Sequence, residues 1–253
     1  MEILTEADLR CGKFKLSDNK VYVTTGTFVT PLAKEYLKSN SLELVFEDCS
    51  VTGGSFGKGV MSYSPIKKTG SRRFIDFETG SSYAEKPEYM THLRDNLLVT
   101  KDHPRILLRG KLDSLEALIM STQVTVEKAG YGNIARDLDE VMNFVQVLLG
   151  CEVKDEPVPE IKLLGMNSQR LRYVSHHLNE EFGIEHSVPH YSMGEVCVAL
   201  NSVRTFIREA ELVAVSAFSQ DGKVTRPDIV EALNRLSSCV YIIFCKKVSG
   251  HYG

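Results

Sequence analysis

Four polar side chains interrupt an otherwise apolar segment between residues 193 and 218: Asn201, Arg204, Arg208 and Glu211. Their spacing of three and four residues places them on one face of a single helix. Two guanidinium groups between apolar flanks are costly to bury unless an opposite charge pairs with them. The next helical segment carries a second polar set: Asn234, Arg235, Ser237 and Ser238. Facing arginines and amides of this kind indicate an anion site, such as a site for a polyphosphate.

Three segments of the chain resemble motifs of one enzyme family, the ATP:cob(I)alamin adenosyltransferases. The segments VRTFIREAE and RPDIVEALNRLSS are similar to the C-terminal helices that line the nucleotide and corrinoid site in that family. DHPRILLRGKLDSLEA is similar to the family motif R-I-x-x-x-G-x-x-D-E-L, with Arg105, Gly110 and Asp113 in register. The ethanolamine-utilization branch resembles the chain more closely than the propanediol-utilization branch, and the resemblance is strongest over residues 86–253.

The resemblance implies a reaction that transfers the 5′-deoxyadenosyl group of ATP to cob(I)alamin, forming adenosylcobalamin (coenzyme B12) and releasing triphosphate. ATP with Mg²⁺ and cobalamin are then the substrates, and Co(I) is the nucleophile. The protein therefore supplies positioning and electrostatic stabilisation, without a catalytic serine, cysteine or histidine. The branch also implies a role in ethanolamine utilization, with a reductase and a B12-dependent lyase as protein partners.

Six residues are the candidates for ATP binding: Lys101, Arg105, Arg204, Arg208, Asn234 and Arg235. Negative charge grows on the triphosphate as it leaves, so Arg204 and Arg208 are expected to stabilise the transition state. The amide of Asn234 suits the adenosine or the ribose. Two structural alternatives stay open, namely a hydrogen bond between helices for Asn234 and a structural ion pair for Arg235.

Four residues are the catalytic candidates: Arg204, Arg208, Asp113 and Glu211. By resemblance, Asp113 pairs with Arg204, an arrangement that often crosses a subunit boundary in the family. Glu211 is expected to orient an arginine or to help hold Mg²⁺ near the nucleotide. Alternatively, Asp113 favours the dipole at the start of its helix, and Glu211 is a solvated helix charge.

The segment FGIEHSVPHYSMG, between the third and fourth predicted helices, corresponds to a stretch that fills the lower axial position of cobalt in the family. An apolar side chain there favours Co(I), because it replaces the axial ligand. The candidates for this cobalamin contact are Phe182, Val188, Pro189 and Tyr191. Ordinary packing is the alternative for each of them.

The cysteines and histidines predict no structural metal, neither zinc nor an iron cluster. The six cysteines include no C-x-x-C pair, and the four histidines within residues 176–190 lack a recognised ligand spacing. Some members of the ethanolamine-utilization branch carry a histidine followed by a C-C-x-x-C cluster, but this chain has no cysteine between Cys49 and Cys151. Reduced thiols are expected. Three of them lie in apolar helices as core residues: Cys197, Cys239 and Cys245.

The phosphate loop T-G-D-x-G-x-T of the propanediol-utilization branch is absent from the chain. The nearest segment, TTGTFVTP, is better explained as a strand-to-helix turn capped by Thr30. Residues 85–105 lead into the first predicted helix of the bundle and are the better candidate for a phosphate-binding loop. Lys86 and His92 are weaker candidates within it, together with Lys101.

The hydrophobic pattern predicts an α+β protein. Residues 1–85 are expected to form a small N-terminal module and a linker, with strands at KVYVTT and LELVFED around the helix TPLAKEYLKS. Residues 86–253 are expected to form the adenosyltransferase domain, a C-terminal bundle of five helices. The predicted helices span residues 111–129, 133–149, 168–183, 193–218 and 227–244.

Composition excludes several classes of protein. A net charge of −3 over 253 residues gives no basic field for nucleic acid. No apolar run reaches the roughly 18 residues of a membrane span, and the first residues lack a secretory pattern. A cytoplasmic location is expected, with association with a bacterial microcompartment left open. The very apolar last helix indicates a central or interfacial position. By resemblance to the family a homo-oligomer is expected, with a trimer favoured and a dimer as the alternative.

Two other functions stay open. A corrinoid-binding carrier or sensor would keep the hydrophobic segment but would not need paired arginines for triphosphate. A helical interaction module would use the polar stripe as an oligomer interface and would not bind ATP. The joint presence of Arg204, Arg208 and Asn234 favours the enzyme.

Overall fold

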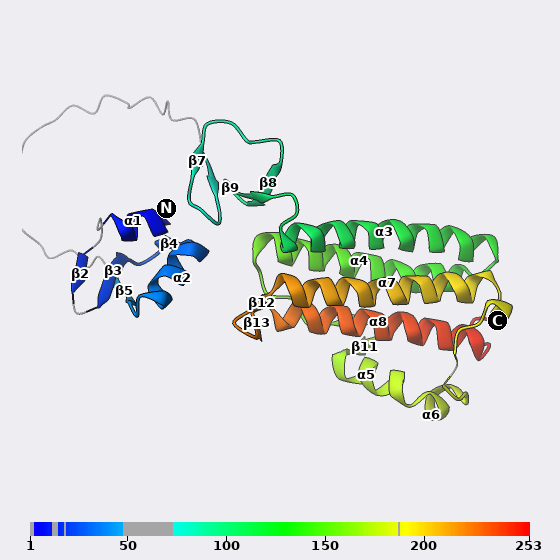
Figure 1. Cartoon of the computed structure of the whole chain (residues 1–253). Coiled ribbons are helices and arrows are strands. Elements are labelled where there is room, and N and C mark those ends of the chain that lie inside the picture. Colours follow the sequence, from blue (N-terminus) through cyan, green and yellow to red (C-terminus); the bar gives the residue numbers. More distant parts are fainter. Residues whose placement is uncertain (1–2, 12–14, 18, 48–72, 187) are drawn as a thin grey trace, which may run out of the picture. The chain divides into compact units, whose positions relative to one another are not determined.

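The computed structural model describes residues 3–11, 15–17, 19–47, 73–186 and 188–253 (Figure 1). The chain divides into two compact units, residues 1–101 and residues 102–253, and each unit is described by itself. The sequence-based boundary between residues 85 and 86 stays a prediction, because compactness alone does not define an adenosyltransferase domain. The glycine- and serine-rich part of the predicted linker, together with Cys49, lies outside the described residues.

The first unit begins with five strands and two helices: β1 (Ile3–Leu4), α1 (Glu6–Arg10), β2 (Lys15–Ser17), β3 (Lys20–Thr24), β4 (Phe28–Val29), α2 (Pro31–Ser39) and β5 (Glu43–Glu47). β3 lies between β2, which is antiparallel to it, and β5, which is parallel to it. β1 and β4 form a separate parallel pair. The expected strand–helix–strand module is thus confirmed as β3–α2–β5.

The alternating pattern of β3 explains the small core of this module. Val21 and Val23 are buried, and they pack with Leu37 of α2 in one apolar cluster because successive side chains of a strand point to opposite faces. The expected helix cap is confirmed: the Oγ1 atom of Thr30 accepts a hydrogen bond of 3.3 Å from the backbone N–H of Ala33.

A four-stranded sheet of order β7-β6-β9-β8 completes the first unit. Its strands are β6 (Phe74–Asp76), β7 (Ser82–Tyr83), β8 (Met90–Arg94) and β9 (Leu97–Thr100). β8 and β9 form an antiparallel hairpin in the region where we expected a phosphate-binding loop. The region forms a strand partly because three consecutive apolar residues of β9 are buried: Leu97, Leu98 and Val99. Their packing stabilises the strand, whereas an open loop would expose them.

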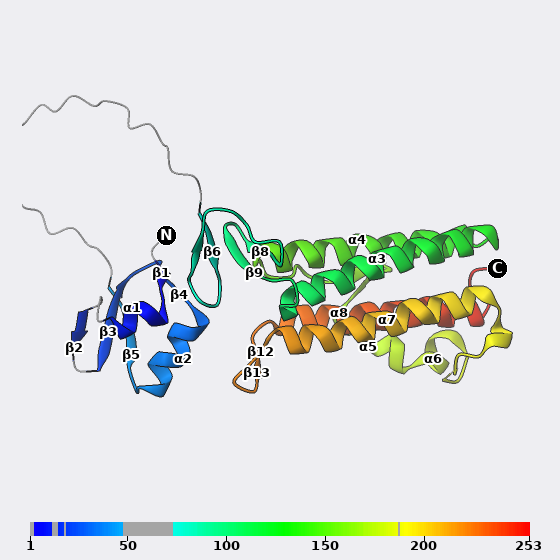
Figure 2. The same ribbon diagram turned by 45° about the horizontal axis from the view of Figure 1, so that its top comes forward.

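The second unit is a helical bundle with three short hairpin or turn elements: α3 (Pro104–Lys128), α4 (Gly132–Lys154), β10 (Lys162–Leu163), β11 (Met166–Asn167), α5 (Ser168–His176), α6 (Leu178–Phe182), η1 (Tyr191–Met193), α7 (Glu195–Ala217), β12 (Ser219–Gln220), β13 (Lys223–Val224) and α8 (Pro227–Val248). The four long helices run side by side, with α3 against α4 and α7, and α8 against α4 and α7 (Figures 1 and 2). α5 and α6 lie along α8.

Helix boundaries differ most from the expectation at α3, α4, α8 and the predicted third helix. α4 ends at Lys154 and α8 at Val248, beyond the predicted ends at residues 149 and 244. α3 begins at Pro104 rather than at residue 111, since His103 caps it by accepting a hydrogen bond of 3.1 Å from the backbone N–H of Arg105. The predicted third helix is broken into α5 and α6 at His177. Asn167 caps α5, because its Oδ1 atom accepts from the backbone N–H of Arg170 at 2.9 Å.

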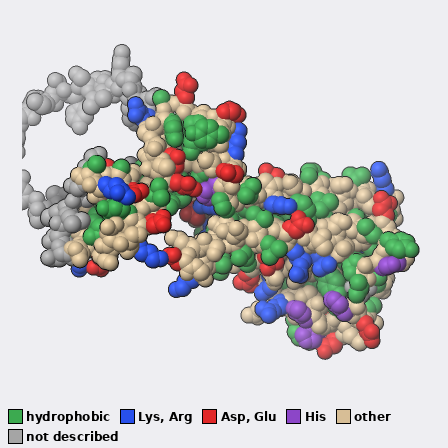
Figure 3. Space-filling view, in the orientation of Figure 1, with side chains coloured by type: hydrophobic (Ala, Val, Ile, Leu, Met, Phe, Trp, Pro, Cys, Tyr) green, Lys and Arg blue, Asp and Glu red, His purple; other side chains and the backbone are tan. Residues whose placement is uncertain are grey.

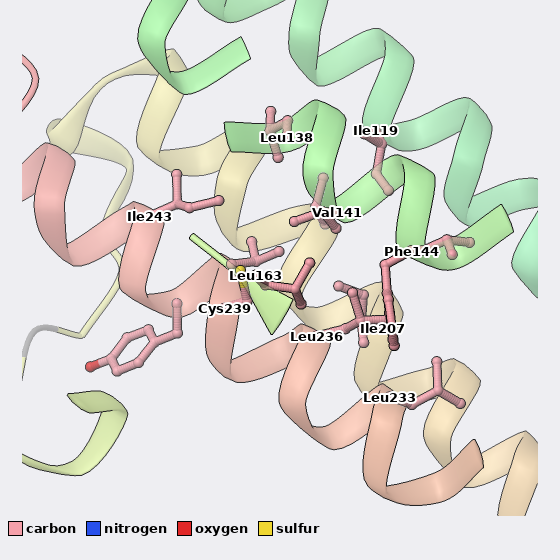
Figure 4. Close-up of a cluster of buried hydrophobic side chains, with 14 of the residues drawn as sticks. Ile119, Leu138, Val141, Phe144, Leu163, Ile207, Leu233, Leu236, Cys239 and Ile243 are labelled. Atoms are coloured by element: carbon pink, nitrogen blue, oxygen red, sulfur yellow. The ribbon is translucent and has the colours of Figure 1, made fainter. Parts of the chain in front are cut away.

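Apolar stripes of the four long helices meet in one core (Figure 4). Leu138 and Val141 of α4 lie with Ile207 of α7 and Leu236 of α8, all fully buried. The recurrence of such residues every three or four positions is what made these helices predictable. Three buried free cysteines belong to this core, as expected: Cys197, Cys239 and Cys245. Of the helices that the structure describes, none is both long and apolar enough to cross a membrane.

Candidate active site in the helical bundle

A cleft of about 750 Å³ opens in the second unit between the α5–α6 side and helices α7 and α8. Its volume falls within the roughly 300–1,000 Å³ that small-molecule sites occupy. Figure 3 shows histidine side chains gathered over α5 and α6, with Lys and Arg side chains close by. The polar and apolar residues predicted from sequence that line the cleft are Arg204, Arg208, Asn234, Ser237, Ser238, Val188 and Pro189.

Arg204 and Arg208 stand one helical turn apart on α7, and both line the cleft. The Nε and Nη2 atoms of Arg204 donate to the Oδ1 atom of Asn201 at 3.1 and 2.9 Å. Its guanidinium also lies over the ring of Tyr241, 5.6 Å from the centroid. Burial and the neighbouring charge of Arg208 lower the pKa of Arg204 from its usual value. Such a shift marks a desolvated cation that an anion would stabilise.

The two arginines have no carboxylate partner in the described part of the chain. Arg204 is half-buried and Arg208 is exposed, whereas other partly buried arginines of the same unit have a carboxylate partner. The guanidinium of Arg226 lies 2.8 Å from the carboxylate of Asp228, for example. The carboxylates of Glu180 and Glu185 also line the cleft, but neither lies at ion-pair distance from the two arginines. A pair of guanidinium groups without a directly bound carboxylate is the arrangement expected of an anion site.

Asn234 stands at the centre of a hydrogen-bonded chain between α7 and α8. Its Nδ2 atom donates to the carboxylate of Glu211 at 3.2 Å, and its Oδ1 atom accepts from Arg235 at 2.6 Å. Because a carboxylate only accepts and a guanidinium only donates, these two partners fix the orientation of the amide. Glu211 therefore holds the amide of Asn234, whereas the sequence led us to expect that it orients an arginine or helps to hold Mg²⁺.

Arg235 is largely buried, with 9% of its surface exposed, and it makes structural contacts. Its Nε atom donates to the hydroxyl of Ser168 at 2.9 Å, and Ser168 in turn donates to Glu231 at 2.7 Å. Arg235 does not line the cleft. In the single chain its position agrees with the ion-pair alternative for this residue and not with a direct contact to ATP.

The apolar candidates fall into two groups. Val188, 75% exposed, and Pro189 line the cleft. Phe182 packs with its ring against His251 at 5.4 Å and is partly buried against the core, and Tyr191 is 81% exposed beside His190. Neither Phe182 nor Tyr191 lines the cleft.

Arg105 lies in a buried ion-pair cluster instead of the cleft. The carboxylate of Glu152 is 0% exposed and pairs with Arg105, at 2.5 Å, and with Arg109. Arg105 also lies over the ring of Phe218, 5.6 Å from its centroid. Phe218 follows Arg208 by ten residues, which corresponds to about 15 Å along a helix. Arg105 therefore neutralises a buried charge near one end of the bundle.

Asp113 is exposed on α3 and has no partner among the described residues, so the pair with Arg204 does not occur inside one chain. The remaining cationic candidates belong to the first unit. The amine of Lys101 lies 3.3 Å from the carboxylate of Glu88, and that of Lys86 donates to the carbonyl oxygen of Met90 at 3.1 Å. His92 packs edge to face with Phe74.

Sequence reasoning missed Tyr241, which joins Arg204 to the α6–η1 segment. Its hydroxyl lies 2.8 Å from the Nδ1 atom of His186, which also lines the cleft. Tyr241 follows Asn234 and Ser238 by seven and three residues, so helical spacing was an available signal. The histidines of the cleft, including His176 and His177, come from a broken helix and a loop, where no such periodicity exists.

Among the described residues, no group of three or more histidine, cysteine, aspartate and glutamate side chains is arranged to hold a metal ion. The predicted absence of zinc and of an iron cluster stays a prediction. Chemically, the cleft combines two arginines, the fixed amide of Asn234 and an apolar rim formed by Val188 and Pro189. This combination suits a ligand with a polyphosphate and a second, more apolar ligand.

The sequence pattern of the family described as cobalamin adenosyltransferase matches residues 83–247 of the chain. The match covers all the residues of the cleft. The chain therefore belongs to the cobalamin adenosyltransferase family and is a transferase.

Within that family, the chain is similar to proteins named corrinoid adenosyltransferase EutT. The protein of Salmonella typhimurium strain LT2 is 27% identical over 260 residues, which cover 99% of this chain and 94% of that protein. The protein of Escherichia coli strain K12 is 28% identical over 255 residues, which cover 98% of this chain and 93% of that protein. The EutT-like corrinoid adenosyltransferase predicted from three sequence motifs is thus confirmed. No solved structure matches the chain.

Proposed function

We propose that the cleft binds ATP and cob(I)alamin together and transfers the 5′-deoxyadenosyl group from ATP to cobalt. Co(I) attacks C5′ of ATP, so a cobalt–carbon bond forms as the C5′–O bond breaks. The electron pair of that bond leaves with the triphosphate. The observation that supports this best is the unpaired arginine couple Arg204 and Arg208 in the cleft of a cobalamin adenosyltransferase.

The arginines act on the leaving group. Hydrogen bonds between a guanidinium and a phosphate are charge-assisted and contribute about 1.5–3 kcal/mol each. In a cleft that already desolvates Arg204, charge developing on the triphosphate meets fixed positive charge without reorganisation of solvent. Asn201 uses two of the five N–H donors of Arg204, so the remaining donors suit the phosphates.

Asn234 binds the adenosine of ATP, and the apolar rim of Val188 and Pro189 contacts the corrin. With one N–H and one lone pair committed to Glu211 and Arg235, the amide of Asn234 keeps one donor and one acceptor for the adenosine. At the cleft Val188 is exposed and Pro189 is half-buried, and both suit the lower face of the corrin, where an apolar side chain replaces the axial ligand. Mg²⁺ enters on the phosphates of ATP and needs few protein ligands.

Asp113 completes the proposal if a second copy of the chain supplies it. It is exposed on α3, and Arg204 has no carboxylate partner in the described part of the chain, so an Asp113 of the partner subunit fits the pair implied by the family. This pairing requires a homo-oligomer, and the resemblance to the family favours a trimer over a dimer. From the motif resemblance to the ethanolamine-utilization branch we also propose a role in ethanolamine utilization, in the cytoplasm or at a microcompartment, beside a reductase and a B12-dependent lyase.

The test is an anaerobic assay that mixes the protein with Mg-ATP and chemically reduced cob(I)alamin and follows the visible spectrum of adenosylcobalamin. Wild-type protein is expected to turn over. Arg208→Ala should lower kcat/KM at least about tenfold, since each charge-assisted bond to phosphate is worth more than 1.4 kcal/mol. Arg170→Ala is the matched control, because Arg170 forms an exposed ion pair with Glu181 on α5 and α6 outside the cleft.

Three outcomes separate the alternatives. Turnover that survives a transition-metal chelator in excess Mg²⁺ supports the metal-free prediction. Corrinoid binding without product would instead identify a carrier or sensor. Absence of ATP binding, with altered assembly in Arg204→Ala, would identify an interaction module.

A further inference from the structure

We propose, on the basis of the function assigned above to the cleft, that Tyr241 is a positioning residue that couples the ATP side of the site to the corrinoid side. Its ring holds Arg204, and its hydroxyl holds His186. The two contacts come from one side chain on α8, and all three residues line the same cleft.

The ring of Tyr241 contacts the guanidinium of Arg204 without carrying a charge of its own. Tyr241 is 9% exposed, and the Arg204 Cζ atom lies 5.6 Å from its ring centroid. Phe244 fixes the ring from the next turn of α8, at 6.1 Å between centroids and 12° between planes. A cation over an aromatic face is stabilised by the ring quadrupole without a formal negative charge. Arg204 is thereby oriented while its charge stays available to an anion.

The hydroxyl of Tyr241 anchors a different part of the site. It lies 2.8 Å from the Nδ1 atom of His186, and the two rings are 5.5 Å apart between centroids. His186 belongs to the segment between α6 and η1 that also carries Val188 and Pro189. The hydrogen bond therefore ties the proposed corrinoid contacts to α8 across 55 positions of sequence.

The proposed reaction requires the two substrates to be aligned with each other. Cobalt must approach C5′ in line with the departing triphosphate oxygen, so the corrinoid and the phosphates have to be fixed relative to each other. A single side chain that supports Arg204 and anchors the segment with the apolar rim contributes to that alignment. A buried tyrosine that merely satisfied its hydroxyl would contribute stability alone.

Two substitutions separate the two contacts. Tyr241→Phe keeps the ring and removes the hydroxyl, so the KM for cob(I)alamin should rise about fivefold, the factor given by one hydrogen bond, while the KM for ATP stays within about twofold. Tyr241→Leu also removes the ring, so the KM for ATP should rise about threefold to tenfold. His186→Ala should raise the KM for cob(I)alamin in the same way, and the double variant should be no worse than Tyr241→Phe, which also removes a hydrogen bond with Cys245.

Tyr252→Phe is the matched control, because the Tyr252 hydroxyl is also partly buried and donates to Asp137, outside the cleft. Its kinetics should equal those of wild type. An unchanged KM for cob(I)alamin in Tyr241→Phe, an equal change in Tyr252→Phe, or additive effects of Tyr241→Phe and His186→Ala would each overturn the coupling. Wild-type protein without turnover would overturn the proposed function itself, which keeps the two failures distinct.

Discussion

The buried carboxylate of Glu152 is expected to be worth more to folding than any exposed ion pair of the bundle. Its side chain is 0% exposed, and the side chains of its partners Arg105 and Arg109 are only 17% and 15% exposed. Glu152→Gln keeps the shape but removes the negative charge that pairs with two guanidinium groups. Removing one partner of a buried ionic cluster costs about 3–5 kcal/mol.

The magnitude converts into a thermal shift. For a domain of this size, 1 kcal/mol corresponds to about 2–4 °C, so Glu152→Gln should lower the Tm by about 6–20 °C. The assay is thermal unfolding followed by circular dichroism at the helical band, with a urea titration to give the free energy of unfolding.

The matched control is Glu209→Gln. Glu209 pairs with Lys111 at 3.1 Å, with 58% and 37% of the two side chains exposed. An exposed pair of this kind contributes about 0–1 kcal/mol, so its loss should shift the Tm by less than about 4 °C. Equal shifts for Glu152→Gln and Glu209→Gln would refute the assignment of a desolvated ionic cluster.

Three further predictions concern single groups. Arg105→Ala should lower the Tm yet leave the KM for ATP within about twofold, since Arg105 does not line the cleft. A clearly raised KM for ATP would instead support the phosphate contact that the sequence predicted for Arg105. Hydrogen bonds from Arg226 lower the pKa of Asp228, so its contribution is complete above the unfolded value of about 3.9 and is lost as pH falls through the folded pKa. Asp228→Asn should remove that part of the acid dependence in urea titrations, and an unchanged profile would contradict it. Burial raises the pKa of Cys245 to about 11, so at pH 8 a thiol reagent should label exposed Cys11 and spare Cys245 until unfolding, as mass spectrometry of the labelled protein can show.

Helical periodicity carried most of what the sequence revealed about the bundle. The apolar stripes of α4, α7 and α8 repeat every three or four residues, and their side chains meet in one core. The same periodicity contained signals that we overlooked. Glu152 continues the stripe of Leu148 on α4, which marks a buried charge, and Tyr241 shares the face of Asn234 and Ser238 on α8.

Other features have weaker local signals. The turn of the β8–β9 hairpin holds Asp95 at φ 47°, a conformation that favours Asp and Asn, and the pair Asp95–Asn96 between apolar runs was a recognisable hairpin signal. The contact between His186 and Tyr241 had none, because a loop residue meets a helix 55 positions away only after the chain has folded. Tertiary packing also decided that Arg105 pairs with Glu152, 47 positions along the chain.

The central claim is that Arg204 and Arg208 form the triphosphate site, and isothermal titration of the intact protein with inorganic triphosphate tests it most directly. Wild-type protein and the control Arg170→Ala should bind with the same affinity. Arg204→Ala and Arg208→Ala should each weaken binding at least about tenfold, with no loss of helix content. Unchanged affinity in both variants would contradict the account and would move the anion site away from this cleft.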